Sequence, residues 1–107
     1  MKILCICAGG NVRSRAFAHR LLYELGHDAL SASHDKQSEA TFTMLCDWAE
    51  RIIVVQPEYL GRIRPVYRPK AKVLDVGPDV YGSCWHFVLQ AKVRDLLDPW
   101  AAKGFPL

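Results

Sequence analysis

The feature that most restricts the fold is an apolar run, Lys2 to Cys7, which ends at two glycines. A continuous apolar run of this length bounded by glycine is typical of a strand buried on both faces of a parallel sheet. From Val12 to Leu25 the apolar residues instead recur at helical spacing, and Gly26 follows as a natural C-terminal stop. A strand that leads directly into a helix indicates the α/β class.

The same alternation continues along the chain. The stretch 51–55, RIIVV, is rich in β-branched residues, and Pro57 closes it, which is typical of a strand. Ser38 is suited to cap a second helix. The remaining pattern predicts strands at 27–33 and 72–76, helices at 38–49, 57–63 and 83–97, and an exposed basic connection at 62–72.

Two of the expected helices have apolar positions that repeat along one face. Pro99 is expected to end the last helix. The face of the second helix contains Thr41, Leu45 and Trp48, and the inward face of the last helix contains Trp85, Val88, Leu89, Val93, Leu96 and Leu97.

Strands that alternate with helices imply right-handed crossovers and a parallel sheet. With 107 residues the chain is expected to form one domain, residues 1–107. We therefore predict a single three-layer α/β domain with a four-stranded parallel sheet flanked by helices. Ligand sites in such sheets lie at the carboxyl ends of the strands. The loops 7–14 and 76–82 both follow strands, so we expect them to share one edge of the sheet.

The composition, the net charge and the N-terminal sequence argue against several classes of function. The net charge of +3 is too weak to indicate nucleic-acid binding, and no apolar run is long enough to span a membrane. The N-terminus does not have the pattern of a signal peptide, so a cytoplasmic protein with reduced thiols is expected. No zinc-ligand spacing is present, and neither a metal nor an organic cofactor is expected. The thiols are Cys5, Cys7, Cys46 and Cys84.

The spacing C-x5-R-S from Cys7 to Ser14 predicts an oxyanion site. A glycine-rich turn between a strand and a helix directs backbone N–H groups and the positive end of the helix dipole at one point. Arg13 can add a bidentate guanidinium, and the same groups would stabilise a thiolate at Cys7 for nucleophilic attack on phosphorus. The expected substrate contacts come from Ala8, Gly9, Gly10, Asn11, Val12 and Ser14.

A phosphatase also needs a proton donor for the leaving alcohol. The stretch LDVGPDVYG contains two candidates, Asp75 and Asp79. Asp79 lies in the turn and is the preferred general acid, whereas Asp75 lies in or at the end of a strand and is expected to be structural. Tyr81 either forms a wall of the substrate site or packs on the core.

These residues resemble the low-molecular-weight protein tyrosine phosphatase superfamily, in particular a compact phosphatase-like branch. C-x5-R-S and the late PDVYG loop match the motifs of that family, SAS at 31–33 resembles its S-A-G, and WAERIIVV at 48–55 resembles its W-A-D-x-I stretch. The resemblance covers most of the chain in the order of the family. Three positions differ, because Gly10, Arg15 and Val80 stand where the family usually has asparagine, proline and proline.

The function predicted from residues and resemblance together is hydrolysis of phosphotyrosine or small aryl phosphates through a phosphocysteine. The partner would be a phosphorylated protein or a small phosphate ester, with the oligomeric state left open. Two alternatives remain: an arsenate reductase of the same fold, or a phosphate- or phosphopeptide-binding module with little turnover. Cys5 and Cys46 are expected to fill the core, whereas Cys84 is a candidate redox partner.

Overall fold

The computed structural model describes all 107 residues and confirms the four-stranded parallel sheet. Its strands are β1 (Lys2–Cys7), β2 (Asp28–Ser33), β3 (Arg51–Val54) and β4 (Ala71–Val73). The helices are α1 (Arg13–Tyr23), α2 (Glu39–Trp48) and α3 (Phe87–Ala102), with the 3-10 helices η1 (Pro57–Arg62) and η2 (Arg68–Lys70). The strand order is β2-β1-β3-β4, so the first strand lies inside the sheet, as its continuous apolar sequence predicts.

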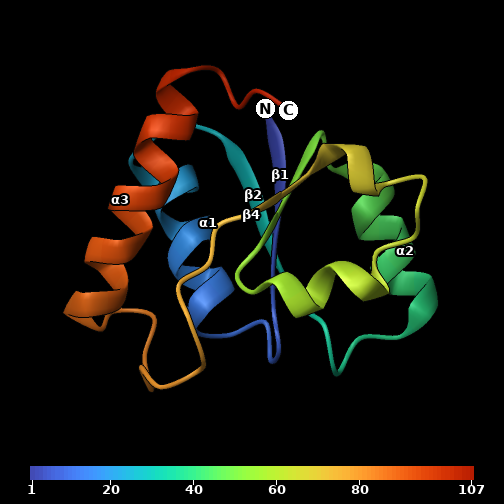
Figure 1. Cartoon of the computed structure of the whole chain (residues 1–107), viewed down its shortest axis with the longest axis horizontal. Helices are drawn as coiled ribbons and strands as arrows, with labels where there is room; N and C mark the ends of the chain where they lie inside the picture. Colours follow the sequence, from blue (N-terminus) through green and yellow to red (C-terminus); the bar gives the residue numbers. More distant parts are fainter.

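Helices cover both faces of the sheet and form the three layers (Figure 1). On one face, α1 and α3 bury residues such as Phe17 and Leu89 against Ile3 and Ile53. On the other face, α2 packs on alternate residues of the same strands, which form a second core. That second core contains Leu4, Ile6, Ala32, Phe42, Cys46, Ala49, Ile52, Val54 and Ile63.

The prediction of which residues of the second helix face the core is wrong by one position. Ser38 caps α2 as predicted, and its hydroxyl oxygen accepts a hydrogen bond from the N–H of Thr41. However, Phe42 and Cys46 are the fully buried residues, whereas Thr41 and Leu45 lie at the margin of the contact. The Arg62 guanidinium lies 4.3 Å from the centre of the Phe42 ring, a contact that the helical repeat alone does not reveal.

The last helix begins later and ends later than its sequence predicts. It starts after His86, so Trp85 lies outside the helix and is 59% exposed instead of facing the core. Pro99 lies within the helix instead of ending it, and the chain stays helical as far as Ala102. Burial of Trp100, whose indole N–H donates to the Pro106 carbonyl, holds the last turn in place despite the proline.

The carboxyl ends of the strands lie at one edge of the sheet, at the bottom of Figure 1, and the two chain termini lie at the opposite edge. The loops after β1 and β4 meet there, since an Arg13 side-chain nitrogen lies 2.9 Å from the Gly77 carbonyl oxygen. This contact confirms that the loops 7–14 and 76–82 share an edge. β4 is shorter than expected and ends at Val73, before the second of these loops. No helix combines the length and apolar character needed to cross a membrane.

Candidate active site

The loop from Cys7 to Ser14, hereafter the Cys7–Ser14 loop, connects the end of β1 to the first turn of α1. Gly10 turns the chain at a φ of +69°, in the left-handed region. Its α-carbon also packs so closely on β2 that an added β-carbon would lie 2.9 Å from the carbonyl carbon of Ala32 and the nitrogen of Ser33. The loop conformation therefore requires glycine at this position for two independent reasons.

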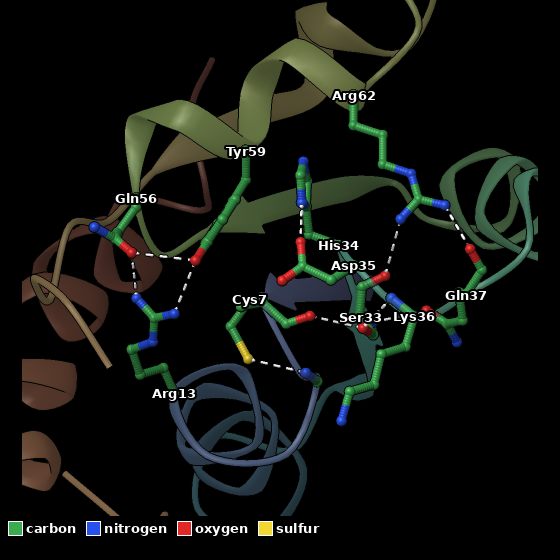
Figure 2. A network of polar contacts seen from close by, with 12 residues as sticks. Cys7, Arg13, Ser33, His34, Asp35, Lys36, Gln37, Gln56, Tyr59 and Arg62 are labelled. Atoms are coloured by element: carbon green, nitrogen blue, oxygen red, sulfur yellow. Dashed lines mark hydrogen bonds and ion pairs between the residues drawn. The ribbon is translucent and has the colours of Figure 1, made fainter. Parts of the chain in front are cut away.

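The residues after β2 hold the outer side of this loop in place (Figure 2). The Ser33 hydroxyl donates to the Ala8 carbonyl oxygen at 2.7 Å, and the Asp35 N–H donates to the same oxygen at 3.1 Å. The His34 N–H donates to the Cys7 carbonyl oxygen at 2.8 Å. These bonds use the outward carbonyl groups, which leaves N–H groups of the loop directed toward the thiol.

The Cys7 thiol is buried but surrounded by donors. Its Sγ atom lies 3.0 Å from the Ser14 hydroxyl oxygen and 3.2 Å from the Gly10 nitrogen, which donates to it. Burial opposes ionisation, but hydrogen bonds from the Ser14 hydroxyl and from the backbone N–H groups of Ser14, Gly10 and Asn11 outweigh it. The pKa of Cys7 is therefore below its usual value. The N-terminus of α1 adds further partial positive charge.

The neighbouring thiols show what burial does without such donors. Burial and the nearby Cys7 thiolate raise the pKa of Cys5 far above its usual value. Burial raises the pKa of Cys46 to about 11, and Cys46 lies in the core on the opposite face of the sheet from Cys7. Both residues fill the core, as the sequence predicts.

Arg13 is almost fully buried, at 1% exposure, and is held by three neutral acceptors. Its Nη1 atom donates to the Gln56 side-chain oxygen at 2.5 Å and to the Gly77 carbonyl oxygen at 2.9 Å. Its Nη2 atom donates to the Tyr59 hydroxyl at 2.9 Å, and that hydroxyl in turn donates to Gln56 at 3.1 Å (Figure 2). Together these contacts fix the plane of the guanidinium.

The same contacts leave one edge of the guanidinium free. Arginine has five N–H donors, of which Nη1 uses two and Nη2 one in this structure. The buried Nε of Arg13 has no partner, and one N–H of Nη2 remains beside it. These two parallel N–H groups match a bidentate oxyanion. The unused donors of this buried guanidinium indicate an anion site.

The two candidate acids lie in different surroundings. The Asp75 carboxylate accepts a hydrogen bond from the Gly77 N–H at 2.8 Å, the bond to nearby backbone that its position predicts. Asp79 is exposed in the loop after β4, and its side chain has no hydrogen bond or ion pair. Asp75 thus shapes the turn that presents the Gly77 carbonyl to Arg13, whereas Asp79 is exposed to solvent.

Tyr81 packs in the core instead of forming a wall of the site. It is 8% exposed, and its hydroxyl donates to the Val76 carbonyl oxygen and lies 3.0 Å from the Lys92 nitrogen. The hydroxyl is thus occupied within the fold, and of the two roles expected for Tyr81 the structure shows the packing in the core. Cys84 is also buried in the core on the same face as Cys7.

Sequence reasoning missed Gln56 and Tyr59, which position Arg13. Their position in the sequence could have indicated this role, because both residues follow β3 at the carboxyl edge of the sheet. The Tyr59 ring packs at 4.7 Å from the His34 ring, whose Nδ1 atom pairs with the Asp35 carboxylate at 2.7 Å. No group of three or more histidine, cysteine, aspartate or glutamate side chains could hold a metal ion.

Comparisons with known proteins find similar solved structures but no similar sequence. The sequence matches no family model and no curated protein. Among solved structures, the chain is similar to Wzb of Vibrio vulnificus in complex with benzylphosphonate, with 20% identity, a TM-score of 0.73, and 95% of this chain and 97% of that chain covered. It is also similar to the tyrosine phosphatase Wzb from Escherichia coli K30 in complex with phosphate, with 22% identity, a TM-score of 0.70, and coverage of 95% and 96%.

A third similar structure is the YwlE arginine phosphatase from Geobacillus stearothermophilus, with 20% identity, a TM-score of 0.71, and coverage of 95% of this chain and 91% of that chain. Two of these three proteins are named as phosphatases, one of tyrosine and one of arginine. The chain therefore has the fold of these phosphatases over nearly its whole length, which confirms the fold that the sequence resemblance implied.

The requirement for glycine at position 10 can be tested against its neighbour. Gly10→Ala is expected to lower the free energy of unfolding by at least about 1 kcal/mol and to weaken phosphate binding, because the left-handed turn and the contact with β2 both exclude a β-carbon. Gly9→Ala, where a β-carbon meets nothing within 4 Å, should change stability by less than about 0.5 kcal/mol. Urea unfolding and phosphate titration would measure both; equal effects of the two variants would contradict the assigned loop geometry.

The contrast between the thiols predicts selective alkylation. Iodoacetate at mildly acidic pH should modify Cys7 much faster than Cys46, since the pKa of Cys7 is lowered and that of Cys46 is about 11. Cys46 should gain reactivity only as the pH approaches 11. Inorganic phosphate should protect Cys7 by occupying the loop. Mass spectrometry of peptides would locate the label, and equal labelling of the two thiols, unaffected by phosphate, would argue against a nucleophilic Cys7.

Proposed function

We propose that this protein is a cysteine-dependent phosphatase that hydrolyses phosphotyrosine or small aryl phosphate monoesters. The observation that supports it most is the buried Cys7 sulfur, which is held by the Ser14 hydroxyl and the Gly10 N–H of its own loop, with the uncompensated guanidinium of Arg13 at the end of that loop. A nucleophile at the base of an oxyanion site is the arrangement that attack on phosphorus requires. The fold shared with phosphatases adds to this support.

In the first step, the Cys7 thiolate attacks phosphorus and forms an S–P bond while the bond from phosphorus to the ester oxygen breaks. The loop N–H groups and Arg13 hold the equatorial oxygens, where charge accumulates in the transition state. Asp79, as the general acid, gives its proton to the departing oxygen. In the second step, the Asp79 carboxylate accepts a proton from water, the water oxygen attacks phosphorus, and the S–P bond breaks to release phosphate and thiolate.

Two of the similar structures support this substrate class. The Wzb protein from Escherichia coli K30 is a tyrosine phosphatase, and the Wzb of Vibrio vulnificus was solved with benzylphosphonate, an arylmethyl phosphonate. We therefore propose a phosphorylated protein or a small phosphate ester as the partner. An arsenate reductase would need further thiols near the nucleophile. Cys46 lies across the sheet from Cys7, whereas Cys5 and Cys84 lie in the same core as Cys7. Burial raises the pKa of Cys5, which leaves Cys84 as the candidate.

Turnover of p-nitrophenyl phosphate tests the proposal directly. The wild-type protein should hydrolyse it, and Cys7→Ser should abolish hydrolysis while still binding phosphate, because the loop and Arg13 remain. Phosphate binding without turnover by the wild type would favour the binding-module alternative. Reduction of arsenate coupled to thioredoxin, and lost in Cys84→Ser, would favour the reductase.

The assignment of the acid can be tested with a matched pair of variants. Asp79→Asn should slow hydrolysis of phosphotyrosine by about 10²- to 10⁴-fold, because a tyrosine leaving group needs protonation. Esters with more acidic phenols should be affected less. Asp75→Asn keeps a side-chain oxygen that can accept from the Gly77 N–H, so it should affect mainly stability. A leaving-group series on both variants measures the difference; steep dependence in Asp75→Asn alone would reverse the two roles.

A further inference from the structure

Every group that holds Arg13 is electrically neutral. Its partners are the amide oxygen of Gln56, the hydroxyl of Tyr59 and the backbone carbonyl of Gly77. No ion pair in the structure includes Arg13. The acidic residues next to these partners in the chain do not contact it either: Glu58 is exposed on η1, and the Asp75 carboxylate is bonded to the Gly77 N–H.

This arrangement is unusual for a guanidinium at 1% exposure. Buried arginines are normally paired with a carboxylate, because an uncompensated charge in a protein interior is costly. Here the hydrogen bonds orient the guanidinium without reducing its charge. The positive charge is therefore uncompensated, and the buried Nε has no hydrogen-bond partner.

Gln56 occupies the central place in this arrangement. Its side-chain oxygen accepts from both Arg13 and Tyr59, so it fixes the two donors relative to each other. A glutamate at this position would have the same shape and could accept the same two hydrogen bonds. It would differ only in adding a full negative charge beside the guanidinium.

We infer that Gln56 is a positioning residue whose neutrality, in addition to its hydrogen bonds, sets the affinity of the Cys7–Ser14 loop for an oxyanion. This inference rests on the anion site of the proposed function and does not depend on turnover. A carboxylate at position 56 would repel an incoming phosphate and offset the charge of Arg13, so affinity would fall although Arg13 stays in place.

The test compares isosteric variants of the full chain by calorimetric titration with inorganic phosphate. Gln56→Glu should weaken phosphate binding by at least about tenfold, because unit charges a few ångströms apart in a protein interact strongly. Gln56→Met removes the hydrogen bonds without adding charge and should weaken binding less. Gln56→Asp and Gln56→Asn repeat the comparison with a shorter side chain, in case the first pair does not fold.

A second measurement separates charge from structure. Without phosphate, Gln56→Glu should unfold at the same temperature as the wild type or higher, since it gains an ion pair with Arg13, whereas Gln56→Met should unfold lower. The inference thus predicts that the carboxylate variant is the more stable protein and the weaker anion binder. The inference would be overturned if phosphate affinity rose and fell with thermal stability across the variants, because Gln56 would then act only by holding the structure together.

The outcomes also distinguish this inference from the proposed function. A wild-type protein that binds phosphate and shows the expected order of variants, but does not hydrolyse p-nitrophenyl phosphate, would refute the phosphatase and support the role of Gln56. A wild-type protein that hydrolyses the ester, with variants whose phosphate affinity follows their thermal stability, would support the phosphatase and refute the role of Gln56. Failure of the wild type to bind phosphate would refute both.

Discussion

The site depends on the buried guanidinium of Arg13, which joins three segments that are distant in the sequence. Arg13 begins α1, and its donors reach Gln56 after β3, Tyr59 on η1 and Gly77 after β4. A buried donor without an acceptor is costly, so these loops are held in one arrangement around it. The same bonds fix the plane of the guanidinium and leave its buried Nε without a partner.

Burial raises the pKa of the Cys5, Cys7 and Cys46 thiols, but hydrogen bonds reverse the effect at Cys7. Cys5 and Cys46 are surrounded by apolar groups, and their pKa values are raised. Cys7 is buried at the end of the same strand as Cys5, yet the N–H groups of the following turn and the Ser14 hydroxyl lower its pKa. The distinction arises from the place where the strand stops. One residue beyond β1, the backbone N–H groups are no longer used by the sheet and are available to the sulfur.

The loop after β4 combines an anchored carboxylate with a free one. The bond from the Gly77 N–H to Asp75 shapes the turn, and the turn presents its carbonyl to Arg13. Asp79 lies beyond this fixed point, exposed and without a partner. A rigid base with a free carboxylate beyond it suits a group that must approach a substrate and then exchange a proton with water. Tyr81 ends the loop by packing in the core, where its hydroxyl donates to the Val76 carbonyl oxygen.

The sequence by itself determined the class of fold, the strand order along the chain and the spacing of nucleophile and arginine. These properties depend on local periodicity and on residues a few positions apart, as in the run from Lys2 to Cys7 and the turn before Arg13. Tertiary structure alone decided the partners of Arg13, the helical passage through Pro99 and the core position of Tyr81. Each of these depends on contacts between residues far apart in the chain, such as Arg13 with Tyr59 or Trp100 with the C-terminal tail, which no local pattern encodes.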